Sequence, residues 1–143
     1  ATDIIQFAGL MGWASETGAV LLAEAGVLAH RGQGAAAAQI LAEAAGELEE
    51  EERAPLVAEA ARIADRAGAS GVAASIREIL VATYEDTPEF GEASLSLARH
   101  KARTPGGVAE AILLLESLIV ARPNAAVVPD ARLELERLRA RTR

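Results

Sequence analysis

Few residues in this chain have the types and spacing that chemistry requires, and the most suggestive is a glycine-rich segment. Gly32, Gln33 and Gly34 precede a run of alanines, as in a loop that cradles a dinucleotide phosphate. That fingerprint needs a β-strand before the glycines, because the loop must connect a strand to a helix. Here the preceding residues, 19–30, have the spacing of a helix. We therefore expect a turn between two helices at this segment, and no cofactor.

Catalytic and metal-binding groups are sparse. The chain has two histidines, His30 and His100, and no cysteine. Each histidine is expected near the end of a helix, where the helix dipole stabilises a cation. No acidic residue is expected inside an apolar stripe, where burial would adapt its carboxyl group for acid–base work. Ser94 and Ser96 have no nearby base. We expect no metal site and no enzymatic activity.

Charge is distributed unevenly along the chain, whose net charge is −7. Residues 1–71 hold 11 acidic and 4 basic side chains, whereas residues 72–143 hold 10 of each. The acidic run 47–53 is expected to be solvated, and so is the basic cluster 99–103, which lacks interleaved aromatic residues. This balance argues against general nucleic-acid binding. It permits attraction between the arginine-rich end of one copy and the acidic front of another.

No stretch of the sequence is apolar for long enough to cross a membrane. The longest apolar run, residues 7–14, is far shorter than the ~18–20 residues that a helical span needs. The first residue is Ala1 rather than methionine. If Ala1 is a processed N-terminus, the protein is secreted or belongs to the cell envelope.

The positions of apolar residues predict an all-α fold. Alanine is abundant and aromatic residues make up only 3% of the chain, so closely packed helices are favoured. Thr87 is expected to cap a helix, and Pro55 and Pro88 to lie in first helical turns. We expect eight helices and no sheet, with the helices at about 3–14, 19–30, 35–48, 55–68, 71–84, 88–103, 107–121 and 129 onward.

The clearest unit is a helical hairpin between Leu95 and Pro123. Its two helices are separated by a turn at residues 104–107, and the second has apolar residues at the i, i+3, i+4, i+7 spacing of an amphipathic helix. Ala111 is expected to be buried where the two helices cross. Pro123 ends the unit. Weaker copies of this hairpin occur earlier in the chain.

The copies are related by the glycines of their turns. Gly32, Gly68 and Gly106 are spaced 36 and 38 residues apart, and a small residue follows each glycine by five positions. This pattern resembles the tetratricopeptide repeat, a helix–turn–helix unit of 34 residues. The third copy carries the resemblance best, through the following residues: Leu95, Ala98, Ala102, Gly106, Ala111, Leu115, Leu118 and Pro123.

The resemblance implies a right-handed α-solenoid forming a single domain, residues 1–143. Three hairpins would occupy residues 18–124, between an apolar N-terminal helix at 1–14 and a C-terminal helix at 128–143 that caps the array. The function it implies is protein binding. The large aromatic residue and the tyrosine of the family's pattern are absent from every copy, so related hairpin solenoids remain open.

The N-terminal helix is the candidate site. Its large apolar side chains surround the whole cylinder: Ile4, Ile5, Phe7, Leu10, Met11 and Trp13. One neighbouring helix would cover about half of them, and an apolar surface left over usually marks an interface. We expect these residues to mediate self-association into an oligomer or a filament, with other copies of the chain as partners. The alternatives are that this helix is simply core, and that the protein is a monomeric scaffold binding a peptide in its concave groove.

Overall fold

In the computed structural model of the chain, residues 24, 27–28 and 31–142 are described. They form six α-helices, one short 3-10 helix and no strand, which confirms the all-α class for this part of the chain. The expected helix at 3–14 lies outside the described residues, and so does most of the helix expected at 19–30. Glu24, Val27 and Leu28 of the latter are helical.

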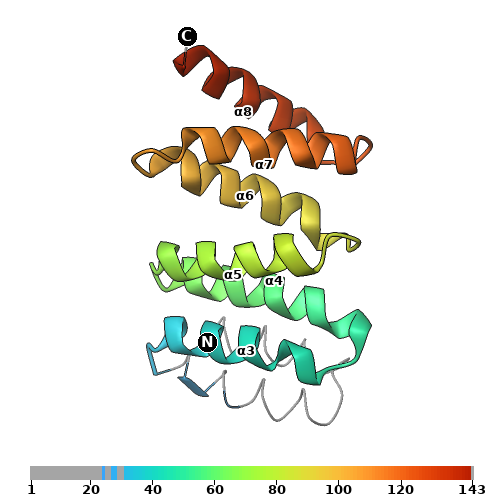
Figure 1. The fold of residues 1–143 in the computed structure, drawn as a ribbon. Helices are drawn as coiled ribbons and strands as arrows, with labels where there is room; N and C mark the ends of the chain where they lie inside the picture. Colours follow the sequence, from blue (N-terminus) through green and yellow to red (C-terminus); the bar gives the residue numbers. More distant parts are fainter. Residues whose placement is uncertain (1–23, 25–26, 29–30, 143) are drawn as a thin grey trace. The chain divides into compact units, whose positions relative to one another are not determined.

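The chain divides into two compact units, Ala1–Leu80 and Val81–Arg143. In the first unit, α3 (Gly34–Ala44) continues into η1 (Ala45–Glu47) and packs against α4 (Glu50–Arg66). The last helix of this unit is α5 (Ser70–Thr83), whose final turn passes the boundary at residue 80. Short turns connect these helices in antiparallel order (Figure 1).

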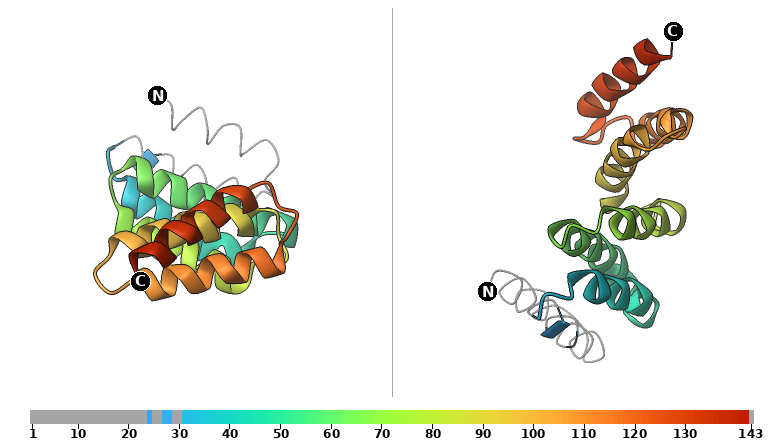
Figure 2. Two further views of the ribbon diagram at one scale, coloured as in Figure 1. Left: turned by 90° about the horizontal axis from the view of Figure 1, so that it is seen from above. Right: turned by 90° about the vertical axis from the view of Figure 1, so that its left-hand side faces the viewer.

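The second unit contains α6 (Glu89–Arg103), α7 (Val108–Ala121) and α8 (Val128–Arg141). Helix α7 packs against both α6 and α8, and α6 also contacts α8 (Figure 2). The guanidinium of Arg122, just after α7, donates a hydrogen bond of 2.6 Å to the carbonyl oxygen of Glu85, just before α6. This bond ties together the two open ends of the α6–α7 hairpin.

The three turn glycines share one backbone conformation. Gly32, Gly68 and Gly106 have φ angles of 80°, 76° and 74°, and no other described residue has a positive φ. Glycine adopts this left-handed conformation without the steric cost that a Cβ atom brings. The sequence spacing of 36 and 38 residues therefore corresponds to a repeated structural feature.

The turns differ in their hydrogen bonds. At Gly32 and Gly68 the residue after the glycine donates to a carbonyl five residues back, Leu28 or Ala64, as in a Schellman helix end. At Gly106 the amide of Gly107 donates instead to Thr104, three residues back, as in a β-turn with glycine in its third position. The third turn is one residue longer on its N-terminal side because Thr104 and Pro105 come after the helix.

The register after each glycine is the same in all three copies. Five residues on, the amides of Ala37, Ala73 and Ala111 each donate a 3.0 Å hydrogen bond to the residue that directly follows the glycine. All three alanines are buried, which confirms the expectation for Ala111. The structure thus repeats a glycine, the first turn of a helix and a buried small residue.

Several expected helix boundaries were wrong. Helix α4 begins at Glu50 rather than at Pro55, and Pro55 lies inside it. The acidic residues of the run form its first turn, because carboxylates are stabilised by the positive end of the helix dipole. Thr87 does not cap α6: its hydroxyl donates to the carbonyl oxygen of Tyr84, and Pro88 occupies the cap position.

Burial agrees with the sequence more closely in α8 than in α5. The sequence predicts Val128, Ala131, Leu135 and Leu138 on one stripe of α8, and all four are buried. Glu134 and Arg137, three residues apart, form an ion pair of 3.6 Å. In α5, the helical spacing from Val72 and Ile76 predicts that Ile79 and Thr83 lie inside, but both are exposed. Ala73 and Ala74 are buried there instead, so the buried face of α5 is narrower than its apolar residues suggest.

Candidate interaction surfaces

The six apolar residues of the predicted N-terminal helix, Ile4, Ile5, Phe7, Leu10, Met11 and Trp13, lie outside the described residues. Their role in self-association stays a prediction. The surfaces that the structure does describe belong to the two units separately. Among the described residues, the first unit has a groove and a network of ion pairs, and the second unit has a groove.

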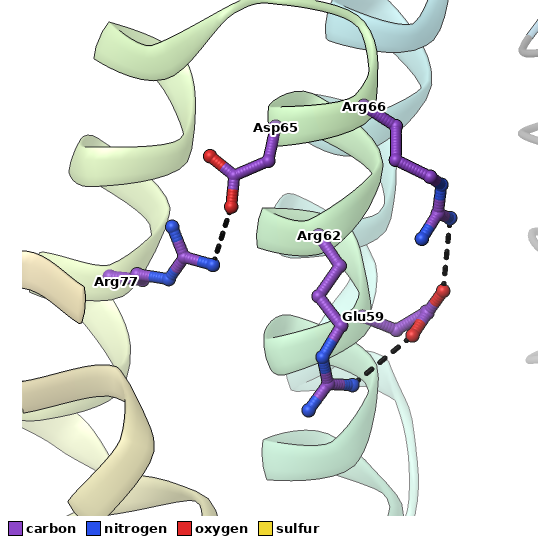
Figure 3. A network of polar contacts seen from close by, with 5 residues as sticks. All are labelled: Glu59, Arg62, Asp65, Arg66 and Arg77. Atoms are coloured by element: carbon purple, nitrogen blue, oxygen red, sulfur yellow. Dashed lines mark hydrogen bonds and ion pairs between the residues drawn. The ribbon is translucent and has the colours of Figure 1, made fainter. Parts of the chain in front are cut away.

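The ion-pair network links α4 to α5 and holds a buried carboxylate. The side chain of Glu59 is only 11% exposed and accepts hydrogen bonds of 3.2 Å from both Arg62 and Arg66 (Figure 3). Beside it, Arg77 on α5 donates to Asp65 on α4 at 2.7 Å. Each carboxylate is thus engaged by a guanidinium group, which favours a structural role over proton transfer.

Two glutamates on α4 correct an expectation made from the sequence. Glu52 and Glu59 are buried among apolar residues of the helix, although no acidic residue was expected in such a place. Glu52 belongs to the acidic run that was expected to be solvated, but it is buried. Other members of the run, Glu47, Glu49 and Glu51, are exposed as expected. The network around Glu59 explains how its charge is accommodated, because buried charges need partners.

A groove in the first unit lies between α3 and α5. Its volume is about 300 Å³. The apolar part of its lining comes mainly from α5, through Val72, Ile76 and Ile79, whereas Gln39 and Glu43 of α3 add polar groups. A groove of this size and composition suits an apolar side chain with a polar or basic group beside it.

A second groove lies between α7 and α8 in the second unit. Its volume is about 430 Å³, and its apolar residues are Ile119, Val120 and Leu135. Its rim carries both signs of charge: Glu116 on α7 and Arg139 on α8 form an ion pair of 3.7 Å, and Arg132 and Glu136 line the same groove. Mixed charge around an apolar floor is typical of a protein-binding surface rather than an anion site.

The remaining candidate groups are dispersed or occupied. Lys101 of the basic cluster pairs with Glu110 at 3.3 Å, while Arg99 and Arg103 are exposed. Ser94 is buried, and its hydroxyl has no hydrogen-bond partner. His100 lies in the last turn of α6, as expected, whereas His30 is outside the described residues.

Among residues 24, 27–28 and 31–142, no three histidine or acidic side chains cluster as metal ligands would. Within the same residues, none of the helices combines the length and the apolar character of a membrane span.

Comparison with protein-family models, with curated proteins and with solved structures gives no match.

Proposed function

We propose that the chain is a non-enzymatic protein-interaction module that self-associates into a structural assembly, an oligomer or a filament, through the ends of its helical repeats. In this proposal the hairpins stack as a right-handed α-solenoid of the tetratricopeptide type, with other copies of the chain as partners. Residues 1–14 form the connecting element.

The observation that supports the proposal most is the repeated hairpin register. The positive φ angle at Gly32, Gly68 and Gly106, followed each time by a buried alanine, recurs three times along the chain and supports a repeated hairpin. Units of this kind stack because no single hairpin can bury its apolar face alone. Such arrays characteristically offer surfaces for other proteins rather than reactive groups.

The character of α8 also favours this proposal. Helix α8 buries one stripe, and its other face carries arginine and glutamate side chains. That division of a terminal helix into an apolar and an ionic face is what a capping helix requires. Residues 1–14 have no such polar face in the sequence, so we assign the connection between copies to that end.

The assignment to residues 1–14 can be tested by deletion. The full chain and a variant lacking residues 1–14 are compared by circular dichroism and by size-exclusion chromatography with light scattering. We expect the variant to stay helical and to lose its assembly. Unfolding of the variant would show that these residues are core, and an unchanged assembly would place the connection elsewhere.

Point substitutions in residues 1–14 should disturb the fold less than the deletion does, so they separate a loss of assembly from a loss of folding. The double variant Phe7→Ser, Trp13→Ser keeps the length of the segment but removes two large apolar side chains. Asp3→Asn is the control, because it changes a polar residue of the same segment. We expect assembly to be lost only in the double variant.

The second candidate function is a monomeric scaffold that binds a peptide. The groove between α3 and α5 favours it, because Ile76 and Ile79 provide an apolar lining next to the carboxylate of Glu43. Under this alternative the full chain has the mass of a monomer at all concentrations. The substitution Ile79→Ser would then weaken peptide binding without changing the mass.

A further inference from the structure

The solvent-facing side of α7 differs from the same side of α3 and α5. The positions seven and fourteen residues after each turn glycine are exposed in all three copies. In the first two copies these positions hold small or polar residues, whereas in the third both are large and apolar. The pairs are Gln39 and Gly46, Ser75 and Ala82, and Leu113 and Val120.

The two apolar residues of α7 are strongly exposed. Leu113 is 64% exposed and Val120 is 82% exposed. They are seven residues apart, which places them about 10 Å from each other along one face of the helix. Ser117 lies between them on the same face and is also exposed. Leu113 and Val120 thus form a short apolar stripe on α7, and the small residue Ser117 lies near the centre of this stripe.

The acidic side chains of α7 itself are neutralised within the unit. Helix α7 has two acidic residues, Glu110 and Glu116. Glu110 pairs with Lys101 of α6 at 3.3 Å, and Glu116 pairs with Arg139 of α8 at 3.7 Å. Because the whole chain carries a charge of −7, copies repel one another over much of their surface. The face of α7 is a place where two copies can approach without that repulsion.

We propose that this face of α7 pairs with the same face of a second copy, in antiparallel orientation about a two-fold axis. Leu113 of one copy then packs against Val120 of the other, and the reciprocal contact follows from symmetry. Ser117 lies close to the axis, where its small side chain allows the two helices to approach. Ser117 lies four residues after Leu113 and three residues before Val120, so it is close to the middle of the stripe, and the two ends of the stripe can each face the opposite end in the second copy.

This contact is independent of residues 1–14. It is isologous, so it closes on a pair of copies instead of continuing as a chain of contacts. Four large side chains form a small interface compared with the roughly 800 Å² per partner of a stable complex. We therefore expect weak pairing, with a dissociation constant of about 100 µM or higher. Combined with a connection through residues 1–14, it would join assemblies side by side.

A single introduced cysteine tests the geometry, because the chain has no cysteine of its own. The variant Ser117→Cys of the full chain is oxidised, and covalent dimers are measured on non-reducing gels. Ser75→Cys, an exposed serine on α5, is the matched control. We expect efficient dimer formation for Ser117→Cys and little for Ser75→Cys. Equal yields for the two variants, or no dimer with Ser117→Cys, would overturn the pairing.

A second set of variants links the dimer to the apolar stripe. In the Ser117→Cys background, Leu113→Ser together with Val120→Ser should lower the rate of dimer formation by about tenfold or more. Leu133→Ser, an equally accessible leucine on α8, should leave the rate unchanged. A rate that does not respond to the double substitution would contradict the proposal. Because the deletion of residues 1–14 is not involved, this result is separate from the test of the proposed function.

Discussion

The second and third hairpins have the same turn glycine but fill the helix that follows it differently. Nine residues after Gly106, Leu115 is fully buried. Nine residues after Gly68 the corresponding residue is Arg77, whose side chain is 16% exposed and pairs with Asp65. The first copy, with buried Leu41, follows the pattern of the third. The shared backbone register thus tolerates either a leucine or an ion pair at this position.

The difference between Leu115 and Arg77 indicates that the second and third hairpins contribute unequally to stability. A buried leucine contributes through the apolar surface that it removes from water and through close packing. A partly exposed ion pair contributes little, because solvent screens it. Among the large apolar residues in the described part of the chain, Val120 of α7 is the most exposed. We therefore regard the third hairpin as more strongly packed than the second at this position, and its solvent-facing side as better suited to contacts with another copy.

The largest effect is expected from Leu115→Ala. Because Leu115 is fully buried, the substitution leaves a cavity in the core and should lower the free energy of unfolding by about 2–5 kcal/mol. Arg77→Leu, at the equivalent position of α5, should change it by less than about 1 kcal/mol. Urea denaturation followed by circular dichroism measures both values. Similar losses for the two variants would remove the contrast between the hairpins.

A second contrast concerns the glycines that precede or begin α7 and α5. A Cβ atom at Gly107 would overlap with the carbonyl oxygen of Lys101, whereas one at Gly71 would meet nothing within 4 Å. Gly107→Ala should therefore cost about 2–3 kcal/mol through backbone displacement. Gly71→Ala should be neutral or slightly stabilising, because alanine favours the helix. A tolerated alanine at position 107 would show that the third turn has another geometry.

The buried alanine of the third hairpin tests the helix crossing itself. Ala111→Leu adds volume where α7 packs on α6 and should destabilise the protein by about 1–3 kcal/mol. The matched substitution Ala109→Leu places the same side chain on the exposed side of α7. Thermal unfolding should show a lower midpoint only for the first variant. An unchanged midpoint for Ala111→Leu would mean that the close crossing is absent.

The smallest effect is expected in the second hairpin, from Asp65→Asn. The Asp65 side chain is 45% exposed, so losing its charge should cost no more than about 1 kcal/mol. The difference from the unaltered protein should shrink in concentrated salt, because screening already weakens the ion pair. A large loss that is independent of salt would show that Arg77 and Asp65 do more than pair at the surface.

The sequence predicted those parts of the fold that depend on local rules. Gly32, Gly68 and Gly106 were identified from spacing alone, and each has the left-handed backbone that favours glycine. The buried stripe of α8 follows from periodicity along the helix, because one buried face gives a clear period. The start of α4 was missed since Pro55 resembled a first-turn residue, while the acidic residues before it already belonged to the helix.

Features that depend on neighbouring helices were harder to predict. The burial of Glu59 requires Arg62 and Arg66 to surround its carboxylate, and the exposure of Ile79 requires that nothing covers that side of α5. Neither follows from periodicity along one helix. The α7 stripe had a detectable signal, namely large apolar residues at positions where the other copies carry polar or small ones. Aligning the copies on their glycines would have revealed it.

Self-association of the full chain is measured most directly by sedimentation velocity over a series of protein concentrations, in dilute and in concentrated salt. Because we assign the contacts between copies to apolar side chains, the weight-average sedimentation coefficient should rise with concentration. It should do so in about 1 M salt as well, where interactions between exposed charges are screened. A single species with the mass of one chain under all of these conditions would contradict the account.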